Sequence, residues 1–268
     1  MAMLRRLPLA GAVVGCATTL TPCAWAAAPW VDRHLTLPRH DWAFDFGLGV
    51  GHTVDDRTQV GVNYEMAVGI TSRVELGVRS GVRFGDGNDR AANADDYGRL
   101  FDRQTLPLQA AGAEPLANPE VLVRGALVRE RVVELALEGR VVLPFANESS
   151  AGLLFGVPLS FHLGDVVRLD TGAYVPIVFV RHDTTVALRV PVDVWIQASS
   201  RFWLGPMTGV ALDRLGENGS STDISLGFGL GYEITHAVDF KAMFLFPTLN
   251  NDSGRDFGFG AGIEVRIE

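Results

Sequence analysis

Residues 59–84 read QVGVNYEMAVGITSRVELGVRSGVRF, and this stretch decides the fold class. Apolar side chains occupy every second position over residues 60–70 and almost every second position over residues 74–84. Such alternation places successive side chains on opposite faces of a β-strand, whereas an amphipathic helix would need apolar residues at i, i+3 and i+4. Residues 71–73 leave room only for a tight turn between the two runs. The stretch therefore predicts two antiparallel strands, each with one apolar face and one polar face.

The same alternation recurs along the chain after residue 40, where strong helical signals are absent. Each run is about ten residues long, which suits a tilted strand that crosses a bilayer, and none approaches the roughly eighteen consecutive apolar residues of a membrane-spanning helix. The predicted strands are Asp41–Gly51, Gln59–Ile70, Val74–Phe84, Glu120–Val128, Val132–Leu143, Gly152–Leu163, Val167–Phe179, Thr185–Gln197, Phe202–Leu212, Asp223–Ile234, Val238–Phe246 and Phe257–Ile267.

The connections between these runs alternate strictly between short and long. The short ones are residues 71–73, 129–131, 164–166, 198–201 and 235–237, and the long ones are residues 52–58, 85–119, 146–151, 180–184, 213–222 and 248–256. Short periplasmic turns on one rim and longer outer loops on the other are typical of outer-membrane barrels, with both chain ends on the short-turn side. We therefore predict an all-β fold, a closed antiparallel transmembrane β-barrel of about twelve strands, with ten or fourteen as alternatives.

Four prolines oppose this interpretation, because they fall inside four consecutive predicted strands. A closed barrel has no edge strand, and each proline removes a hydrogen bond from the ladder. We expect local bulges at these positions. The alternatives are a wrong strand assignment in this third of the chain, or a soluble periplasmic sandwich, which alternation alone would also fit. The prolines are Pro158, Pro176, Pro191 and Pro206.

The N-terminus has the features of a secretory signal peptide. Arg5 and Arg6 form a short basic region, and an apolar stretch follows from Leu7 to about residue 20. The triplet at residues 24–26, Ala-Trp-Ala, is a small-x-small cleavage pattern. We predict that residues 1–26 are removed on export.

Residues 27–40 are then predicted to form an N-terminal periplasmic segment, and residues 41–268 the transmembrane barrel. The alternative is a lipoprotein cleavage box that would place a lipid on Cys16. Since Cys16 and Cys23 are the only cysteines, the mature chain would have no disulfide, thiolate metal site or thiol nucleophile. The formal net charge of −8 argues against nucleic acid as a partner.

The hairpin at Gly69–Gly77, GITSRVELG, resembles the strand–turn–strand signature common in porin-like bacterial outer-membrane β-barrel proteins, and Glu233–Phe240 is a weaker second copy. The resemblance implies the outer membrane of a Gram-negative bacterium as location, with outer-membrane lipid and the outer-membrane insertion machinery as partners. One feature departs from the class. Such chains usually end on an aromatic residue that helps insertion, and this one ends Ile267-Glu268.

If the apolar face meets lipid, the polar face lines the lumen. Its charges are of mixed sign, so they could pair across neighbouring strands, line a wet channel with acidic and basic walls, or simply form a solvated face without a substrate. The predicted lumen-lining charged residues are Glu65, Glu75, Arg79, Arg83, Glu120, Arg124, Glu134, Glu138, Arg140, Arg168, Asp170, Arg189, Asp193, Asp223, Glu233, Asp239, Lys241, Glu264 and Arg266.

Glycines occupy many inward positions of the first strand and of strands near the C-terminus. The first and last strands must pair to close the barrel, so their shared inner wall would be nearly bare of side chains. Inward glycines either relieve crowding where a small barrel bends or leave free space for passage. The predicted lumen-lining small residues are Gly47, Gly49, Gly227, Gly229, Gly258, Gly260 and Gly262.

The longest connection, residues 85–119, is rich in aspartate and asparagine, as calcium loops are. Its spacing misses the calcium-loop pattern because Arg90 occupies the third ligand position. We therefore predict a solvated surface loop that either constricts the mouth or lies outside it. The histidines show neither a serine–histidine constellation nor metal-ligand spacing, so no catalytic residue, metal or cofactor is predicted.

These features lead to one functional hypothesis with two alternatives. The favoured function is a passive, porin-like channel for small polar solutes, without enzymatic activity. The first alternative is a non-conducting outer-membrane barrel that is structural or binds an external partner. A lipid-modifying outer-membrane enzyme is the third, since barrels of this kind host unrelated functions.

Overall fold

The computed structural model describes residues 29–52, 58–85, 116–144, 151–180, 183–213, 215, 221–246, 249 and 257–268. The predicted signal peptide, residues 1–26, and most of the predicted loop at residues 85–119 lie outside the described residues. Within the described ranges, the elements are one short 3-10 helix, η1 (Trp30–Asp32), and a series of strands. No helix in these ranges is long and apolar enough to cross a membrane.

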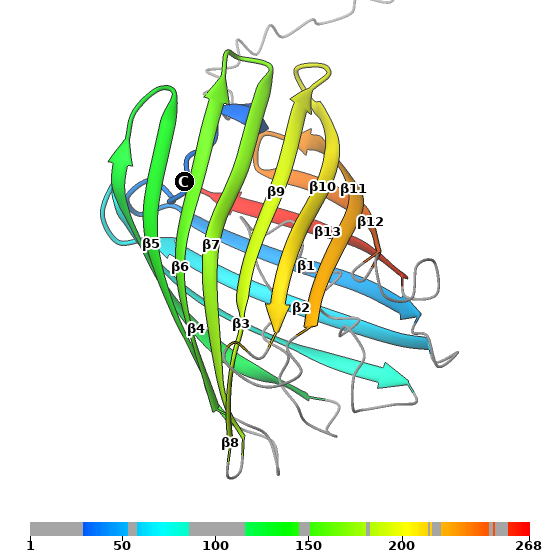
Figure 1. The fold of residues 1–268 in the computed structure, drawn as a ribbon. Helices are drawn as coiled ribbons and strands as arrows, with labels where there is room; N and C mark the ends of the chain where they lie inside the picture. The colour runs from blue at the N-terminus through cyan, green and yellow to red at the C-terminus, as the bar shows by residue number, and fades with distance from the viewer. Residues whose placement is uncertain are drawn as a thin grey trace, which may run out of the picture.

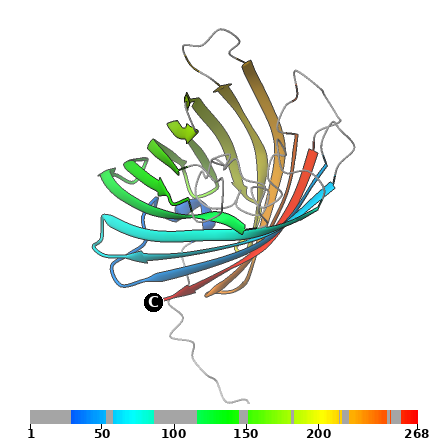
Figure 2. The ribbon, with the colours of Figure 1, turned by 90° about the horizontal axis from the view of Figure 1, so that it is seen from below.

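The strands form one antiparallel ring (Figure 1). Their order around the ring is β6-β5-β4-β3-β2-β1-β13-β12-β11-β10-β9-β7-β8, and the β6–β7 pairing closes it. Figure 2 turns the same ring so that its interior is seen from one end. The bounds are β1 (Trp42–His52), β2 (Thr58–Gly69), β3 (Val74–Gly85), β4 (Leu116–Arg129), β5 (Val133–Val142), β6 (Ala151–Leu163), β7 (Val167–Val180), β8 (Asp183–Val186), β9 (Leu188–Gln197), β10 (Phe202–Asp213), β11 (Ser221–Thr235), β12 (Val238–Phe246) and β13 (Phe257–Ile267).

The strands β8 and β9 occupy one position in the ring. Both strands pair with β7, and the register is the same for both. The last β8 pair is Ile177↔Val186, and the β9 pairing begins at Tyr174↔Arg189. Only Ala187 separates them, and its amide donates to the carbonyl of Pro176 at 3.1 Å. The thirteen strands therefore make a twelve-stranded closed barrel with one interrupted strand, which confirms the predicted fold class.

The four prolines lie inside strands, but the prediction of bulges at these positions is wrong. Near Pro158, the β5–β6 pairing is interrupted between Leu135↔Leu159 and Glu138↔Gly156, and it resumes in the same register. The β9–β10 ladder skips the pair at Pro206 in the same way. The register shifts in the described strands fall elsewhere, in the β3–β4, β4–β5 and β11–β12 pairings. The barrel thus tolerates these prolines by leaving out ladder hydrogen bonds rather than by inserting residues.

The two faces of the ring differ in chemistry. Large apolar side chains such as Phe46, Phe155 and Phe259 are more than half exposed on the outside, at 56%, 57% and 51%. The residues between them point inward and are buried. An outer belt of exposed apolar side chains around a polar interior is the arrangement of a transmembrane barrel.

Both described chain ends lie at the rim with the short turns. The last strand ends beside the first, with Trp42 opposite Ile267, and Val265 lies opposite Val238, next to the short turn between β11 and β12. In outer-membrane barrels the rim with the short turns faces the periplasm. The helix η1 lies at the same end (Figure 1).

Candidate functional site in the barrel lumen

Most of the charged residues assigned to the lumen are buried on the inner face. Arg189, Asp223 and Arg266 are only partly buried, and the side chain of Arg83 lies outside the described part of β3. The fifteen buried residues are Glu65, Glu75, Arg79, Glu120, Arg124, Glu134, Glu138, Arg140, Arg168, Asp170, Asp193, Glu233, Asp239, Lys241 and Glu264.

The wall formed by β2–β5 carries a continuous series of ion pairs of alternating sign. Arg124 is fully buried and shows the pattern: its guanidinium lies 2.7 Å from Glu138 and 3.5 Å from Glu75. Because each acidic side chain has a basic neighbour, this wall compensates most of its own charge, and buried charges need such pairing. In spatial order the series is Glu65, Arg79, Glu120, Arg140, Glu138, Arg124 and Glu75.

Ion pairs also join inward-facing side chains on other strands of the ring. Lys241 contacts Glu264 and lies 2.9 Å from Asp45, so one buried cation joins β12, β13 and β1. On β7, Arg168 lies 2.7 Å from Asp170. Most of the buried inner charges are therefore ion-paired with one another.

Toward the long loops, the seam between β1 and β13 carries only glycines on its inner face, whereas Asp45, Glu264 and Arg266 lie on it nearer the short turns. Gly47 lies opposite Gly262, and Gly49 lies opposite Gly260. Gly258, Gly260, Gly47, Gly49 and Gly229 are buried, while Gly227 and Gly262 are partly buried. This strip leaves the adjacent lumen free of side chains, because a glycine contributes no atoms beyond the backbone.

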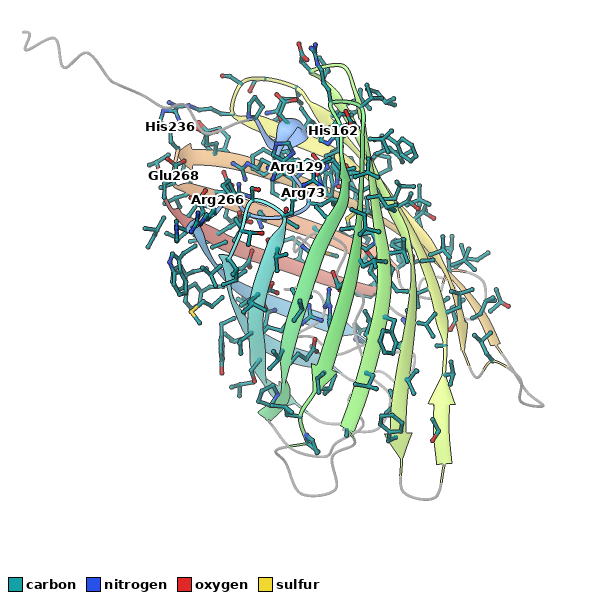
Figure 3. The ribbon with its side chains drawn as sticks, turned by 90° about the vertical axis from the view of Figure 1, so that its left-hand side faces the viewer. Arg73, Arg129, His162, His236, Arg266 and Glu268 are labelled. Carbon is teal, nitrogen blue, oxygen red and sulfur yellow. The ribbon has the colours of Figure 1, made fainter. Side chains whose placement is uncertain are left out.

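The N-terminal segment, residues 29–40, lies among the inward-facing side chains at the short-turn end of the barrel. The side chains of Val31, Leu35 and Leu37 are 0%, 1% and 1% exposed. Figure 3 shows η1 beside His162, at the end of the barrel that also carries Arg73 and Arg129. The segment thus occupies the periplasmic end of the lumen.

Side chains of the barrel wall accept hydrogen bonds from the backbone amides of this segment. The amide of Leu35 donates to Glu134 Oε2 at 2.8 Å, and the amide of Leu37 donates to Glu75 Oε2 at 2.7 Å. The amide of Val31 donates to the Gln197 side chain at 3.4 Å. Three different strands, β5, β3 and β9, therefore hold the segment by its backbone.

The carbonyl groups of the segment are held by basic side chains. Arg168 NH1 donates to the carbonyls of Arg33 at 2.6 Å and Trp30 at 3.4 Å. Arg124 NH1 donates to the carbonyl of Leu35 at 3.2 Å. The His162 ring donates through Nδ1 to the carbonyl of Val31 at 2.6 Å. Hydrogen bonds from charged groups are stronger than neutral ones, so these contacts fix the path of the segment.

An aromatic cluster anchors the start of the segment. The ring of Trp30 stacks on Trp203 with centroids 4.9 Å apart and planes inclined by 2°, and it meets the edge of Trp195 at 6.2 Å. Trp203 lies flat over Gly231, where an added Cβ would lie 2.1 Å from the ring. Lys241 is 5.2 Å from the centroid of Trp30, within the range of a cation–π contact. Gly231 is thus required for the pocket that receives Trp30.

The segment leaves the lumen over the end of β2. The amide of His40 donates to the carbonyl of Gly69 at 2.8 Å, and an added Cβ at Gly69 would lie 1.8 Å from the carbonyl oxygen of Pro38. His40 has a left-handed φ of 72°, which turns the chain into β1. Burial raises the pKa of the adjacent Asp41, and the negative charge of Glu268 raises it further.

Sequence reasoning missed this segment and its aromatic pocket. Two signals were present. Leu35 and Leu37 are apolar residues in a stretch predicted to face water, and Trp195 and Trp203 fall on the polar face of their strands. Large apolar groups in such positions require a burial partner, and Trp195 and Trp203 find theirs in Trp30 and Val31 of the segment.

Comparisons with known proteins bear on the fold. A scan of known protein families and a search of curated proteins each find no match. Among solved structures, the COG4313 outer membrane channel from Pseudomonas putida F1 is similar with a TM-score of 0.61 and 8% identity, over 87% of this chain and 97% of that one. The NanC porin gives 0.59 and 9%, over 84% of this chain and 100% of that one, and the KdgM porin gives 0.53 and 9%, over 84% and 99%.

Fold and lumen together define a porin-like transmembrane β-barrel of the outer-membrane type. At identities of 8–9% the similarity to porins and a channel extends to the fold alone. The described residues contain no group of three or more histidine, cysteine, aspartate or glutamate side chains placed to hold a metal ion.

Proposed function

We propose that this protein is a passive channel for small polar solutes in the outer membrane of a Gram-negative bacterium. On this proposal, outer-membrane lipid surrounds the barrel, the insertion machinery places it there, and a cleaved signal peptide exports it. The observation that carries the proposal is the combination of a closed twelve-stranded barrel with a polar inner face and a glycine-lined seam between β1 and β13. A barrel of this size encloses more room than an eight-stranded one, whose side chains can fill its interior.

Narrowing the glycine seam tests conduction. The double variant Gly49→Leu and Gly260→Leu adds two side chains to the inner face at one paired position. We expect its single-channel conductance in a planar bilayer to fall by a clear fraction of the parent value, and its stability in lipid to change little. Phe259→Leu, next to Gly260 but on the outer face, is the matched control and should leave conductance unchanged.

Two results would count against the channel. An unchanged conductance in the double variant would show that ions do not pass along the seam. No channels from the parent protein or from a variant without the N-terminal segment, with folding verified by circular dichroism, would favour a non-conducting barrel. That second candidate has one observation in its support, since residues 30–37 fill the periplasmic end of the lumen.

A lipid-modifying enzyme is a third candidate without such support. Three histidines of the described part contact carboxylates: His34 and His162 meet Glu134, and His236 meets Glu233 at 2.9 Å. These contacts differ from the serine–histidine pair that an esterase nucleophile needs.

A further inference from the structure

The periplasmic end of the lumen contacts the N-terminal segment as a binding site contacts an extended peptide. Three amides and four carbonyls of residues 30–37 are hydrogen-bonded to side chains of the wall. Contacts to backbone groups hold a chain in place regardless of its side chains. Side-chain contacts come mainly from the aromatic cluster, in which Trp30 contacts Trp203, Trp195 and Lys241, and from the Arg33–Asp239 and His34–Glu134 pairs.

The wall keeps most of its charge pairing without the segment. Glu75, Arg124 and Glu138 pair with one another, and Arg168 pairs with Asp170. Glu134 retains His162, whose Nε2 lies 3.4 Å from it. The principal ion pair lost on departure is Arg33–Asp239. Departure also breaks the contacts of Arg33 with Glu264 and of His34 with Glu134, but Glu264 keeps Lys241 and Glu134 keeps His162. Removing a buried charge partner is costly, so the electrostatic cost of departure falls mainly on Asp239.

The segment also reaches across the lumen rather than along one wall. Its hydrogen bonds, ion pairs and ring contacts go to wall residues on β3, β4, β5, β6, β7, β9, β10 and β12. With Val31, Leu35 and Leu37 at most 1% exposed, water does not pass beside these side chains.

We propose that the short-turn end of the lumen is a binding site for an extended peptide with an aromatic anchor, and that residues 29–40 are its tethered ligand. While bound, they close the channel at its periplasmic end, and the channel opens when they leave. The closing effect rests on the proposed channel function, whereas the peptide site does not.

The test separates binding from conduction. A variant lacking residues 29–40 is refolded, and a synthetic peptide of residues 29–40 is added to the short-turn side. We expect the variant to conduct, the peptide to bind it by calorimetry, and the bound peptide to reduce the conductance to that of the full chain. A peptide with Trp30→Ala should bind at least about tenfold more weakly, because it loses the indole that stacks on Trp203 and meets the edge of Trp195.

The outcomes distinguish the two proposals. If the full chain conducts as well as the shortened variant, the tethered ligand does not close the lumen and this inference is wrong. If the peptide binds but neither protein conducts, the peptide site stands and the channel function fails. If the peptide does not bind to a folded, conducting variant, the peptide site is wrong.

Cysteine reactivity in the full chain keeps the inference testable if the shortened variant does not fold. With Cys16 and Cys23 replaced by serine, Leu37→Cys is compared with Arg39→Cys two residues along. Leu37 is buried and Arg39 is exposed, so a charged thiol reagent should modify the cysteine at residue 37 at least about tenfold more slowly. Excess free peptide should raise that rate by displacing the segment. Equal rates at both positions would overturn the inference.

Discussion

The substitution Arg124→Met removes the cation that joins Glu138 to Glu75 in the ion-pair series on β2–β5. Glu138 keeps Arg140 as a partner, but Glu75, which is 1% exposed, loses the arginine that lies 3.5 Å away. Breaking a buried ion pair by removing one partner costs about 3–5 kcal/mol. The lost hydrogen bond to the carbonyl of Leu35 adds roughly 1 kcal/mol, so we expect a loss of unfolding free energy at the upper end of that range.

Reversible urea unfolding in lipid vesicles, followed by tryptophan fluorescence, measures this loss. The double variant Arg124→Met and Glu75→Gln should recover part of it, with a coupling free energy above about 1 kcal/mol, because the uncompensated carboxylate is gone. The control is Arg131→Met at the exposed pair with Asp165, which should show no measurable change. A loss below about 1 kcal/mol for Arg124→Met, or strictly additive effects of the two substitutions, would refute the idea that the charged wall is a coupled network.

Three further predictions follow from the two faces of the barrel and from its N-terminus. Phe228→Arg, on the outer face, should cost about 2–4 kcal/mol of stability in lipid, whereas Ser225→Arg, on the inner face, should cost much less. Equal costs in the same unfolding assay would contradict the assignment of the two faces. Gly231→Val should push the ring of Trp203 out of place and make the N-terminal segment accessible to protease, while an unchanged cleavage pattern would show that the aromatic pocket does not hold it. The intact mass of protein extracted from membranes should correspond to a chain that begins at residue 27, and an acylated species would replace the signal-peptide assignment with a lipoprotein.

The strands could be predicted because their information is local. Alternation over residues 59–84 depends only on neighbours in sequence, and β2 and β3 begin and end within a few residues of the predicted bounds. The interruption between β8 and β9 could not be predicted in this way. It depends on Ala187 meeting Pro176 across the ladder, and that pairing exists only once the register is known.

The contents of the lumen are a long-range property. Which inward charges meet depends on the stagger between strands, so the alternation could select Glu75 and Arg124 as inward residues but not pair them. The N-terminal segment was harder still, because Leu35 and Leu37 meet acids and arginines that lie 38 to 99 residues further along the chain. A short segment without a periodic pattern of apolar residues gives little indication in its sequence of where it will bind.

A single-channel recording of the Trp30→Ala variant of the full chain tests the central claim most directly. This substitution leaves every barrel residue in place and removes only the side chain that stacks on Trp203. If the barrel conducts and its own N-terminal segment closes it, the variant should open far more often than the parent. Its openings should have the same unit conductance as those of the variant that lacks residues 29–40. An open probability equal to that of the parent, in protein shown to be folded, would contradict the account.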